Sequence, residues 1–367
     1  MLRRDFLSLS TRTAGVAVAA APLTSSMLTG AHHGRKPLGV ALMGLGNYAT
    51  RQLAPAFKET HHCKLTGVVS GDPAKAKRWS DEHGFAPENI YDYENFDSIA
   101  KNPDIDVVYI VLPNSMHLEF IERSAAAGKH VICEKPMTVT AEESRRAIKA
   151  CRAAGVQLSV GYRLHFDPNY RALMLARGTA PSGQVRYVQA DMAFPMGNPN
   201  QWRLRKALAG GGAMYDVGVY CTQSARFFVG EEPIAVTAQE FKTDPVKFAE
   251  VDETIMFQLE FPGGATANCT TSYGFRSNSV HVDYQKGWGS LQPAHNYGPI
   301  QGVLHNQPLE PRKFSQQALQ MDDFVRCIRE GVESEVSGLE GLKDALVVDA
   351  VYQSIANGSR RTLIESV

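Results

Sequence analysis

Leu38-Gly39-Val40-Ala41-Leu42-Met43-Gly44-Leu45-Gly46-Asn47-Tyr48-Ala49 is the stretch of this sequence that decides the fold. Its first half is a continuous apolar run, as expected of a strand buried on both faces of a parallel sheet. Its second half, from Gly44 to Ala49, matches Gly-x-Gly-x-x-Ala and opens an amphipathic segment. The first glycine permits a tight turn, the second lets the backbone approach a pyrophosphate, and Ala49 permits close helix–sheet packing. In this context the pattern predicts a dinucleotide site at a helix N-terminus.

Strand and helix patterns alternate downstream of this loop. Such alternation predicts a parallel sheet with right-handed crossovers, and we place a Rossmann domain over residues 37–160. The predicted strands are 38–43, 64–69, 107–112, 130–133 and 157–160, and the predicted helices are 73–84, 116–127 and 142–153.

The second part of the chain, residues 161–367, has a different pattern. Period-two stretches predict antiparallel strands over 184–193, 234–241, 254–261, 265–273 and 279–284. A helical stripe of Ala345, Val348, Tyr352 and Ile355 follows, and we expect this last helix to pack back near the Rossmann domain. The fold class is therefore α/β: an N-terminal Rossmann domain plus a C-terminal α+β domain with a large, mostly antiparallel open sheet.

Composition argues against several classes of function. The 367 residues contain 38 basic and 38 acidic side chains, with no basic block, so no nucleic-acid partner is expected. The six cysteines are far apart and form no Cys-x-x-Cys pair, which argues against a structural zinc site or a disulfide scaffold. We predict no metal site.

The N-terminus carries a twin-arginine sequence, Arg3-Arg4-Asp5-Phe6-Leu7. The apolar stretch 14–22 is too short for a stable membrane anchor. We therefore interpret residues 1–31 as a removable Tat export signal, which predicts contact with the Tat export machinery and a periplasmic location. Cleavage after Ala19-Ala20-Ala21 or near Gly30-Ala31 both fit, and the alternative is a disordered cytosolic tail.

The end of the second predicted strand bears on the choice between NAD and NADP. An acid about 20 residues beyond the glycine loop would bind the ribose 2′-hydroxyl of NAD. That place is taken by Ser70 and Gly71, with Lys75 on the next helix, while Asp72 suits a helix N-cap. A hydroxyl and a nearby cation favour the 2′-phosphate of NADP; the alternative for Lys75 is a solvated helix face.

Cys133-Glu134-Lys135-Pro136 follows the strand predicted over 130–133, at the edge where open α/β sheets bind ligands. A lysine there can hold a sugar hydroxyl and favour ionisation of a neighbouring acid. The alternative for this Glu-Lys pair is a surface ion pair.

Together with Gly161-Tyr162-Arg163-Leu164-His165, these motifs resemble the Gfo/Idh/MocA oxidoreductases, and most closely the glucose–fructose oxidoreductase branch. That resemblance implies a Rossmann domain followed by an open antiparallel sheet. It rests on segments that span most of residues 38–360: Val69-Ser70-Gly71, Tyr91-Asp92-Tyr93, 109–115, 201–205, 209–212, 216–220 and 230–233.

The resemblance also implies roles for individual residues. Lys135 would be the catalytic lysine, Tyr220 the general base where most of the family has histidine, and Asp216, one helical turn earlier, would orient the sugar. Arg163 and His165 would line the sugar site together with Lys135, Asp216 and Tyr220. The implied cofactor contacts are Gly44, Leu45, Gly46, Asn47, Tyr48, Ser70, Gly71, Lys75, Tyr93, Leu112, Pro113, Asn114, His117, Glu134, Lys135, Arg163, Trp202 and Arg203.

The function implied is that of a periplasmic, NADP-containing sugar oxidoreductase. It would oxidise an aldose to its lactone and reduce a second sugar by ping-pong hydride transfer through tightly bound NADP(H). An NADP-dependent aldose dehydrogenase with exchangeable cofactor, a nicotinamide-dependent glycosidase and a non-catalytic sugar or NADP sensor are the alternatives. The exposed face of the second-domain sheet predicts a homo-oligomer, a dimer or a tetramer. In contrast to the branch it resembles, only residues 32–37 separate the predicted signal from the first strand.

Overall fold

The glycine-loop strand lies at the centre of a six-stranded parallel sheet with the order β3-β2-β1-β4-β5-β6. The computed structural model describes residues 36–311 and 313–367, so the predicted export signal of residues 1–31 lies outside the described residues. The strands are β1 (Leu38–Met43), β2 (Cys63–Val69), β3 (Ile90–Tyr91), β4 (Val107–Ile110), β5 (His130–Cys133) and β6 (Leu158–Val160). This order reverses beside β1, which is the topology of a Rossmann fold and confirms the prediction.

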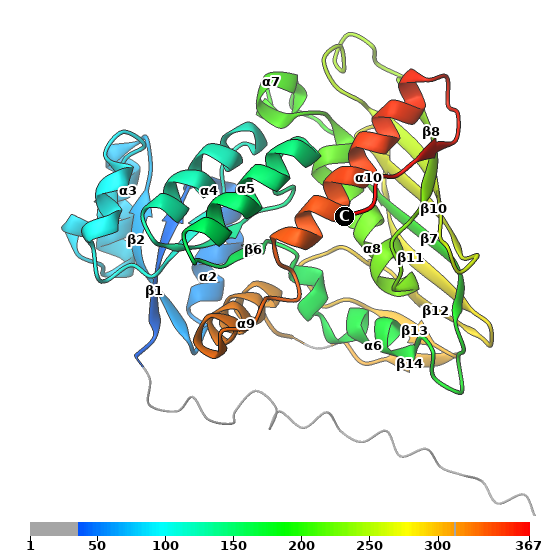
Figure 1. Ribbon diagram of the computed structural model, residues 1–367, viewed down its shortest axis with the longest axis horizontal. Coiled ribbons are helices and arrows are strands. Elements are labelled where there is room, and N and C mark those ends of the chain that lie inside the picture. The colour runs from blue at the N-terminus through cyan, green and yellow to red at the C-terminus, as the bar shows by residue number, and fades with distance from the viewer. Residues whose placement is uncertain (1–35, 312) are drawn as a thin grey trace, which may run out of the picture. The chain divides into compact units, whose positions relative to one another are not determined.

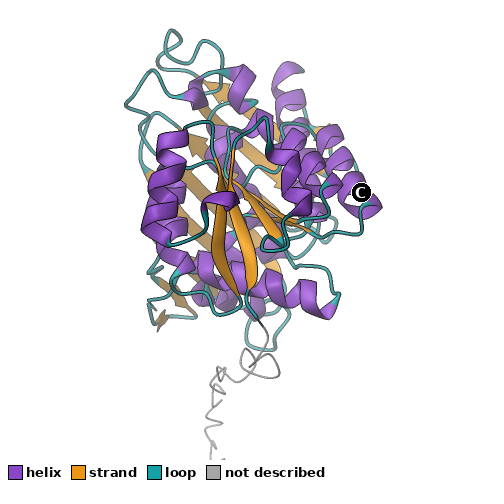
Figure 2. Ribbon diagram, turned by 90° about the vertical axis from the view of Figure 1, so that its left-hand side faces the viewer, coloured by secondary structure: helices purple, strands orange, loops and turns teal. Residues whose placement is uncertain are grey.

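Helices cover both faces of this sheet (Figures 1 and 2). One face packs on α4 (His117–Ala126) and α5 (Ala141–Ala153). The other packs on α2 (Ala54–Phe57), α3 (Pro73–His83) and α9 (Gln316–Glu330). The last of these comes from the C-terminal part of the chain, so residues more than 200 positions apart in sequence share one core.

The second sheet is larger and mostly antiparallel, as predicted. Its nine strands follow the order β14-β13-β12-β11-β7-β10-β9-β8-β15, and among these neighbours the β7–β10 pair is parallel. Its strands are β7 (Val185–Ala193), β8 (Ala235–Phe241), β9 (Thr254–Glu260), β10 (Thr266–Ser272), β11 (Ser277–Tyr284), β12 (Trp288–Leu291), β13 (Gly302–Leu304), β14 (Gln307–Leu309) and β15 (Thr362–Leu363).

One face of this large sheet is covered by helices. Apolar residues of α6 (Pro168–Ala176), α8 (Val219–Val229) and α10 (Gly338–Ala356) form a single core with alternate strand residues. On the opposite face, side chains such as that of Met256 are exposed. The short α7 (Lys206–Ala209) lies near the Rossmann part of the chain, where Asn114 donates to the carbonyl of Ala209 at 2.8 Å.

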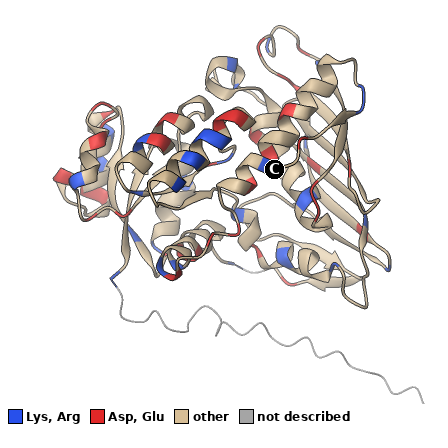
Figure 3. Cartoon of the chain, viewed as in Figure 1, with Lys and Arg blue, Asp and Glu red and all other residues tan. Residues whose placement is uncertain are grey.

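The helix α10 contacts both parts of the chain (Figure 1). It packs on β8 and also on α5, where the Asp349 carboxylate accepts from the backbone N–H of Ala141 at 3.0 Å. Acidic and basic side chains are interspersed along the helices over the Rossmann sheet (Figure 3). Within residues 36–311 and 313–367, we find no helix with the length and apolar character needed to span a membrane.

Candidate active site

A cavity of about 830 Å³ lies at the carboxyl ends of the parallel strands, between the glycine loop and the second sheet. Open α/β sheets bind their ligands at this edge. The structure brings together in its wall these residues singled out from the sequence: Gly44, Leu45, Gly46, Asn47, Tyr48, Ser70, Gly71, Lys75, Tyr93, Leu112, Pro113, Asn114, Glu134, Lys135, Arg163, Trp202, Arg203, Asp216 and Tyr220.

The glycine loop offers the cradle that a pyrophosphate needs. Gly44 has φ +92°, and a Cβ there would lie 2.4 Å from the carbonyl oxygen of Val111, so this position excludes every side chain. At Gly46, in contrast, no atom of the described residues lies within 4 Å of a Cβ position. The second glycine is therefore not required by packing and leaves open space toward the cavity. This loop fits a dinucleotide.

The adenosine end of the cavity has one carboxylate among its described lining residues, that of Asp72. Asp72 caps α3 by accepting from the backbone N–H of Lys75 at 2.9 Å, as predicted. Its own N–H donates to the hydroxyl of the buried Ser70 at 3.1 Å. Gly71 lies against the ring of Tyr93, 3.0 Å from where a Cβ would be. Besides the capping Asp72, the side chains at this end are therefore a hydroxyl, an aromatic ring and the half-buried Lys75.

Lys135, Asp216 and Tyr220 converge at the other end of the cavity. The Lys135 ammonium donates to the carbonyl oxygen of Asp216 at 2.5 Å and lies 3.4 Å from its carboxylate Oδ1. The same Nζ lies 4.7 Å from the ring centroid of Tyr220. Asp216 belongs to a π-helical turn, Met214–Gly218, that leads directly into α8. That turn presents Asp216 and Tyr220 to one lysine from β5's carboxyl end.

Asp216 is surrounded by donors. Arg203 Nε lies 3.0 Å from its Oδ2, and the hydroxyl of Tyr273 donates to the same oxygen at 3.0 Å. Burial by itself would raise the pKa of Asp216, but the charges of Arg203 and Lys135 outweigh burial and hold this pKa at about 2. The residue is therefore a fixed carboxylate that orients its cationic neighbours.

Arg163 also lies beside Tyr220. Its guanidinium Nη2 is 3.5 Å from the Tyr220 hydroxyl and its centre lies 5.4 Å from that ring. Arg163 is therefore a second cation beside the phenol, a role that sequence reasoning gave to Lys135 alone. The Nε of Arg163 is buried without a hydrogen-bond partner among the described residues.

Glu134 completes the polar floor of the cavity. It is buried, and burial raises its pKa although the hydroxyl of Tyr109 donates to it at 2.8 Å. A Cβ on Gly161 would lie 2.7 Å from this carboxyl group, so the Gly161 that precedes Tyr162 and Arg163 makes room for Glu134.

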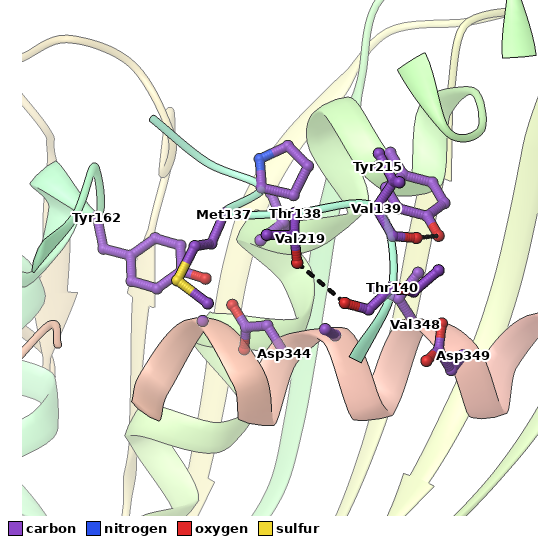
Figure 4. Close-up of a pocket in the computed structure, with 13 residues that line it drawn as sticks. Met137, Thr138, Val139, Thr140, Tyr162, Tyr215, Val219, Asp344, Val348 and Asp349 are labelled. Atoms are coloured by element: carbon purple, nitrogen blue, oxygen red, sulfur yellow. Dashed lines mark hydrogen bonds between the residues drawn. The ribbon is translucent and has the colours of Figure 1, made fainter. Parts of the chain in front are cut away.

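The segment that directly follows Lys135 packs against the turn that carries Tyr215 and against α10 (Figure 4). Tyr215 donates to the carbonyl of Val139 at 2.7 Å, and the Thr138 hydroxyl donates to the carbonyl of Thr140 at 2.9 Å. Below them, α10 approaches closely because Gly341 has no side chain where Met137 packs. Lys135 is thus positioned by a segment clamped between α8 and α10.

Two histidines that the sequence placed at the site do not line this cavity. His117 is fully buried and its ring nitrogens lie 2.9 Å from the carbonyls of Pro136 and Leu112. It joins two loops that line the cavity instead of facing it. His165 packs edge-on against Phe227, with ring centroids 3.6 Å apart, and burial lowers its pKa to about 3. Helix packing turns its side chain into the core.

Sequence reasoning missed several lining residues. The most polar of them, His295, Asn296 and Tyr297, belong to the loop between β12 and β13. Apolar side chains form another wall, beside Trp202. No periodicity or motif marks either group, because their position depends on how the large sheet approaches the Rossmann domain. The remaining lining residues are Asp72, Val111, Met192, Phe194, Met196, Gln201 and Val217.

Comparisons with known proteins agree with this geometry. Residues 38–162 match the GFO_IDH_MocA model, described as an oxidoreductase family with an NAD-binding Rossmann fold, and residues 177–288 match the GFO/IDH/MocA C-terminal domain. The chain is 30% identical to D-xylose 1-dehydrogenase [NADP(+)] of Haloarcula marismortui, over 87% of this chain and 91% of that protein. It is 27% identical to D-xylose 1-dehydrogenase (NADP(+)) 2 of Haloferax volcanii, over 87% and 97%.

Among solved structures, the chain is similar to aldose-aldose oxidoreductase from Caulobacter crescentus, which was crystallised with glycerol. The two are 42% identical, with a TM-score of 0.84 over 90% of this chain and 100% of the other.

Proposed function

This chain belongs to the Gfo/Idh/MocA family of oxidoreductases, and from that premise we propose that it oxidises one aldose and reduces a second sugar through a single retained NADP(H). The observation that carries the proposal is one cavity that joins an open glycine cradle to Lys135, Asp216 and Tyr220. The class of enzyme, a nicotinamide-dependent sugar oxidoreductase, follows from the family and its relatives.

NADP is the cofactor that fits the adenosine end. The only acid near the 2′-position, among the described lining residues, is Asp72, and its carboxylate already caps α3. Ser70 and Lys75 remain to meet a 2′-phosphate. Two curated relatives are named as NADP(+)-dependent xylose dehydrogenases, which supports the same choice.

When bound, NADP+ would accept a hydride from the sugar carbon and NADPH would return one. Tyr220 holds the proton of this exchange: its phenol would donate to a carbonyl oxygen during reduction, and the resulting phenolate would accept the proton of a hydroxyl during oxidation. Arg163 and Lys135 both lie beside the phenol and stabilise the charge that its oxygen carries after the proton leaves. Asp216 keeps Lys135 and Arg203 in place.

Two lines of support favour a second sugar as the hydride acceptor. The similar Caulobacter protein is named an aldose-aldose oxidoreductase, so it pairs two sugars. Arg3-Arg4 predicts Tat export, a route that carries folded proteins with their cofactors. A periplasmic enzyme has no pool of free NADP, and reduction of a second sugar regenerates the cofactor where it is bound.

The redox state of bound nucleotide tests this proposal. Protein purified without added nucleotide should carry NADP(H), a first aldose should reduce it, and a second sugar should oxidise it again, all without free cofactor. A protein that arrives empty and turns over only with added NADP+ is instead an exchangeable aldose dehydrogenase, the function that the names of the xylose dehydrogenase relatives favour.

A further inference from the structure

The loop between β12 and β13, residues 292–301, forms a rigid platform over the cavity. Its ends are joined by the hydrogen bond from the N–H of Gln292 to the carbonyl of Gln301 at 2.9 Å. The side-chain oxygen of Asn278, on β11, accepts from the N–H groups of Ala294 and His295 at 3.0 and 2.8 Å. Because three of its backbone donors, those of Gln292, Ala294 and His295, are satisfied inside the second domain, the first half of this loop is preorganised.

Arg163 ties this platform to the end of the Rossmann domain. Its guanidinium donates to the carbonyl of His295 at 2.6 Å and to that of Asn296 at 2.7 Å. The same guanidinium lies 4.3 Å from the ring centroid of Tyr297. Arg163 is only 2% exposed, so these are buried, charge-assisted bonds. The Tyr297 ring therefore has a fixed, cationic support beneath it.

The other side of Tyr297 faces the glycine loop. Its ring centroid lies 5.9 Å from that of Tyr48, at an interplanar angle of 38°. Tyr48 is on the helix that begins at the glycine loop, and its hydroxyl accepts from Gln317 of α9 at 3.4 Å. Tyr297 is nevertheless 46% exposed. The two tyrosines thus form one aromatic contact between the second domain and the loop that would cradle the pyrophosphate.

We propose that Tyr297, supported by Arg163 and packed on Tyr48, is a clasp that slows release of NADP(H). A nucleotide that leaves the glycine loop at this edge must part the two rings. Rotation of the Tyr297 ring away from Tyr48 breaks its contact with Arg163, and movement of the whole platform breaks the hydrogen bonds to Asn278 and Arg163. The inference rests on the retained cofactor of the proposed function and assigns that retention to a residue.

The experiment measures how fast bound NADPH leaves the protein. Purified holoprotein is reduced with aldose, freed of sugar and mixed with an unrelated enzyme that oxidises NADPH as it is released. Tyr297→Ala should release NADPH on the order of tenfold faster than the wild type, as loss of an aromatic contact predicts. Tyr297→Phe keeps the ring and should stay within about twofold of the wild type.

Tyr48→Ala removes the other ring, and the double variant should release NADPH no faster than either single variant. Phe241→Ala is the matched control, because Phe241 is a 47% exposed aromatic residue on β8 and does not line the cavity. Thermal unfolding of each variant shows whether it folds.

The clasp is overturned if Tyr297→Ala folds and releases NADPH at the wild-type rate. A raised KM for the sugar with unchanged release also overturns it, because Tyr297 would then be a sugar platform. A wild-type protein that is purified without bound nucleotide contradicts the retained cofactor of the proposed function. In that case the equilibrium affinity for NADP+ tests the clasp: Tyr297→Ala should weaken binding and Phe241→Ala should not, and equal affinities would overturn it.

Discussion

At the scale of single residues, the chemistry of this site depends on how charge surrounds one phenol. Tyr220 lies beside both the Lys135 ammonium and the Arg163 guanidinium, and Asp216 neutralises the first of these cations. The lysine is itself held by a backbone carbonyl, so its position does not depend on substrate. Each of these groups therefore has a separable role.

Tyr220→Phe removes the proton-transfer group and leaves the aromatic packing. We expect kcat for sugar oxidation to fall on the order of 100-fold or more, as loss of a general acid–base does. Bound nucleotide should remain at the wild-type level, which absorbance of the purified protein checks. Tyr187→Phe, on the outer face of β7, is the control and should keep full activity. Full turnover by Tyr220→Phe would rule out the proposed proton carrier.

The two glycines of the loop should respond differently to alanine. Gly46→Ala fills open space, so thermal stability should stay near that of the wild type while copurified nucleotide is lost. Gly44→Ala places a Cβ against the Val111 carbonyl at φ +92°, so both stability and nucleotide should fall. Equal nucleotide content in Gly46→Ala and the wild type would contradict the cradle.

Asp216 predicts a distinctive response to acid. Its folded pKa of about 2 lies below the ordinary 3.8, so the carboxylate stabilises the fold above pH 4 and loses this contribution as pH falls toward 2. Asp216→Asn lacks that contribution at every pH. The gap in unfolding free energy between wild type and variant should therefore narrow by about 1 kcal/mol between about pH 6 and about pH 3. Urea titrations measure it; a constant gap would contradict the ionised Asp216.

At the scale of elements, α8 is the part that connects catalysis to stability. Its first turn carries Tyr220, and its last turn carries Arg226, whose side chain is 1% exposed. Arg226 pairs with Asp344 at 2.5 Å and Glu340 at 2.7 Å on α10, and with Glu232 at 2.7 Å just beyond α8. The helix α10 also packs against the chain that follows Lys135. The Arg226 cluster therefore fixes α8, which carries Tyr220, relative to the segment that carries Lys135.

Arg226→Leu should break that cluster and leave the buried Asp344 carboxylate without a cation, while Glu340 and Glu232 keep their pairs with Lys343. We expect the free energy of unfolding to fall by about 3–5 kcal/mol, as removal of one partner from a buried ion pair does. Arg361→Leu removes the surface pair with Glu260 and should leave stability unchanged within the error of measurement. Urea unfolding measures the free energy of unfolding of both variants. Equal losses of this free energy would contradict a stabilising role for the buried cluster.

At the scale of the whole molecule, the active site exists only where two sheets meet. The Rossmann sheet supplies Lys135 and the glycine loop, while the segments around the second sheet supply Asp216, Tyr220 and Tyr297. The outer face of the nine-stranded sheet, which carries the exposed Met256, is the surface through which we predict a homo-oligomer.

The predicted export also concerns the whole molecule. Replacing both Arg3 and Arg4 by lysine should keep the protein in the cytoplasm, because the Tat machinery recognises the arginine pair. Sugar-dependent activity should then move from the periplasmic to the cytoplasmic fraction of fractionated cells. Arg51→Lys, at an exposed site of the described chain, is the matched control and should not alter location. Unchanged export of the double-lysine variant would remove the main argument for a retained cofactor.

Local sequence predicted the features that depend on consecutive residues. The strand, turn and helix around Gly44 and Gly46 use adjacent positions, and Asp216 and Tyr220 share a helical segment. The two-residue strand β3 was missed, because so short an element has no periodicity. His165 was misplaced at the cavity, because the contact with Phe227 that buries it joins different elements.

The sequence by itself determined the nucleotide loop and the fold class, since each follows from short-range geometry or a contiguous motif, and the resemblance to a family implied the residues of the proposed reacting centre. Only the tertiary structure decided which groups surround Tyr220, where Arg203 finds Asp216, and that Tyr297 meets Tyr48. These contacts join residues far apart in the chain. Their geometry is set by packing of α8, α9 and α10 between two sheets, and burial of apolar surface, not local propensity, selects that packing.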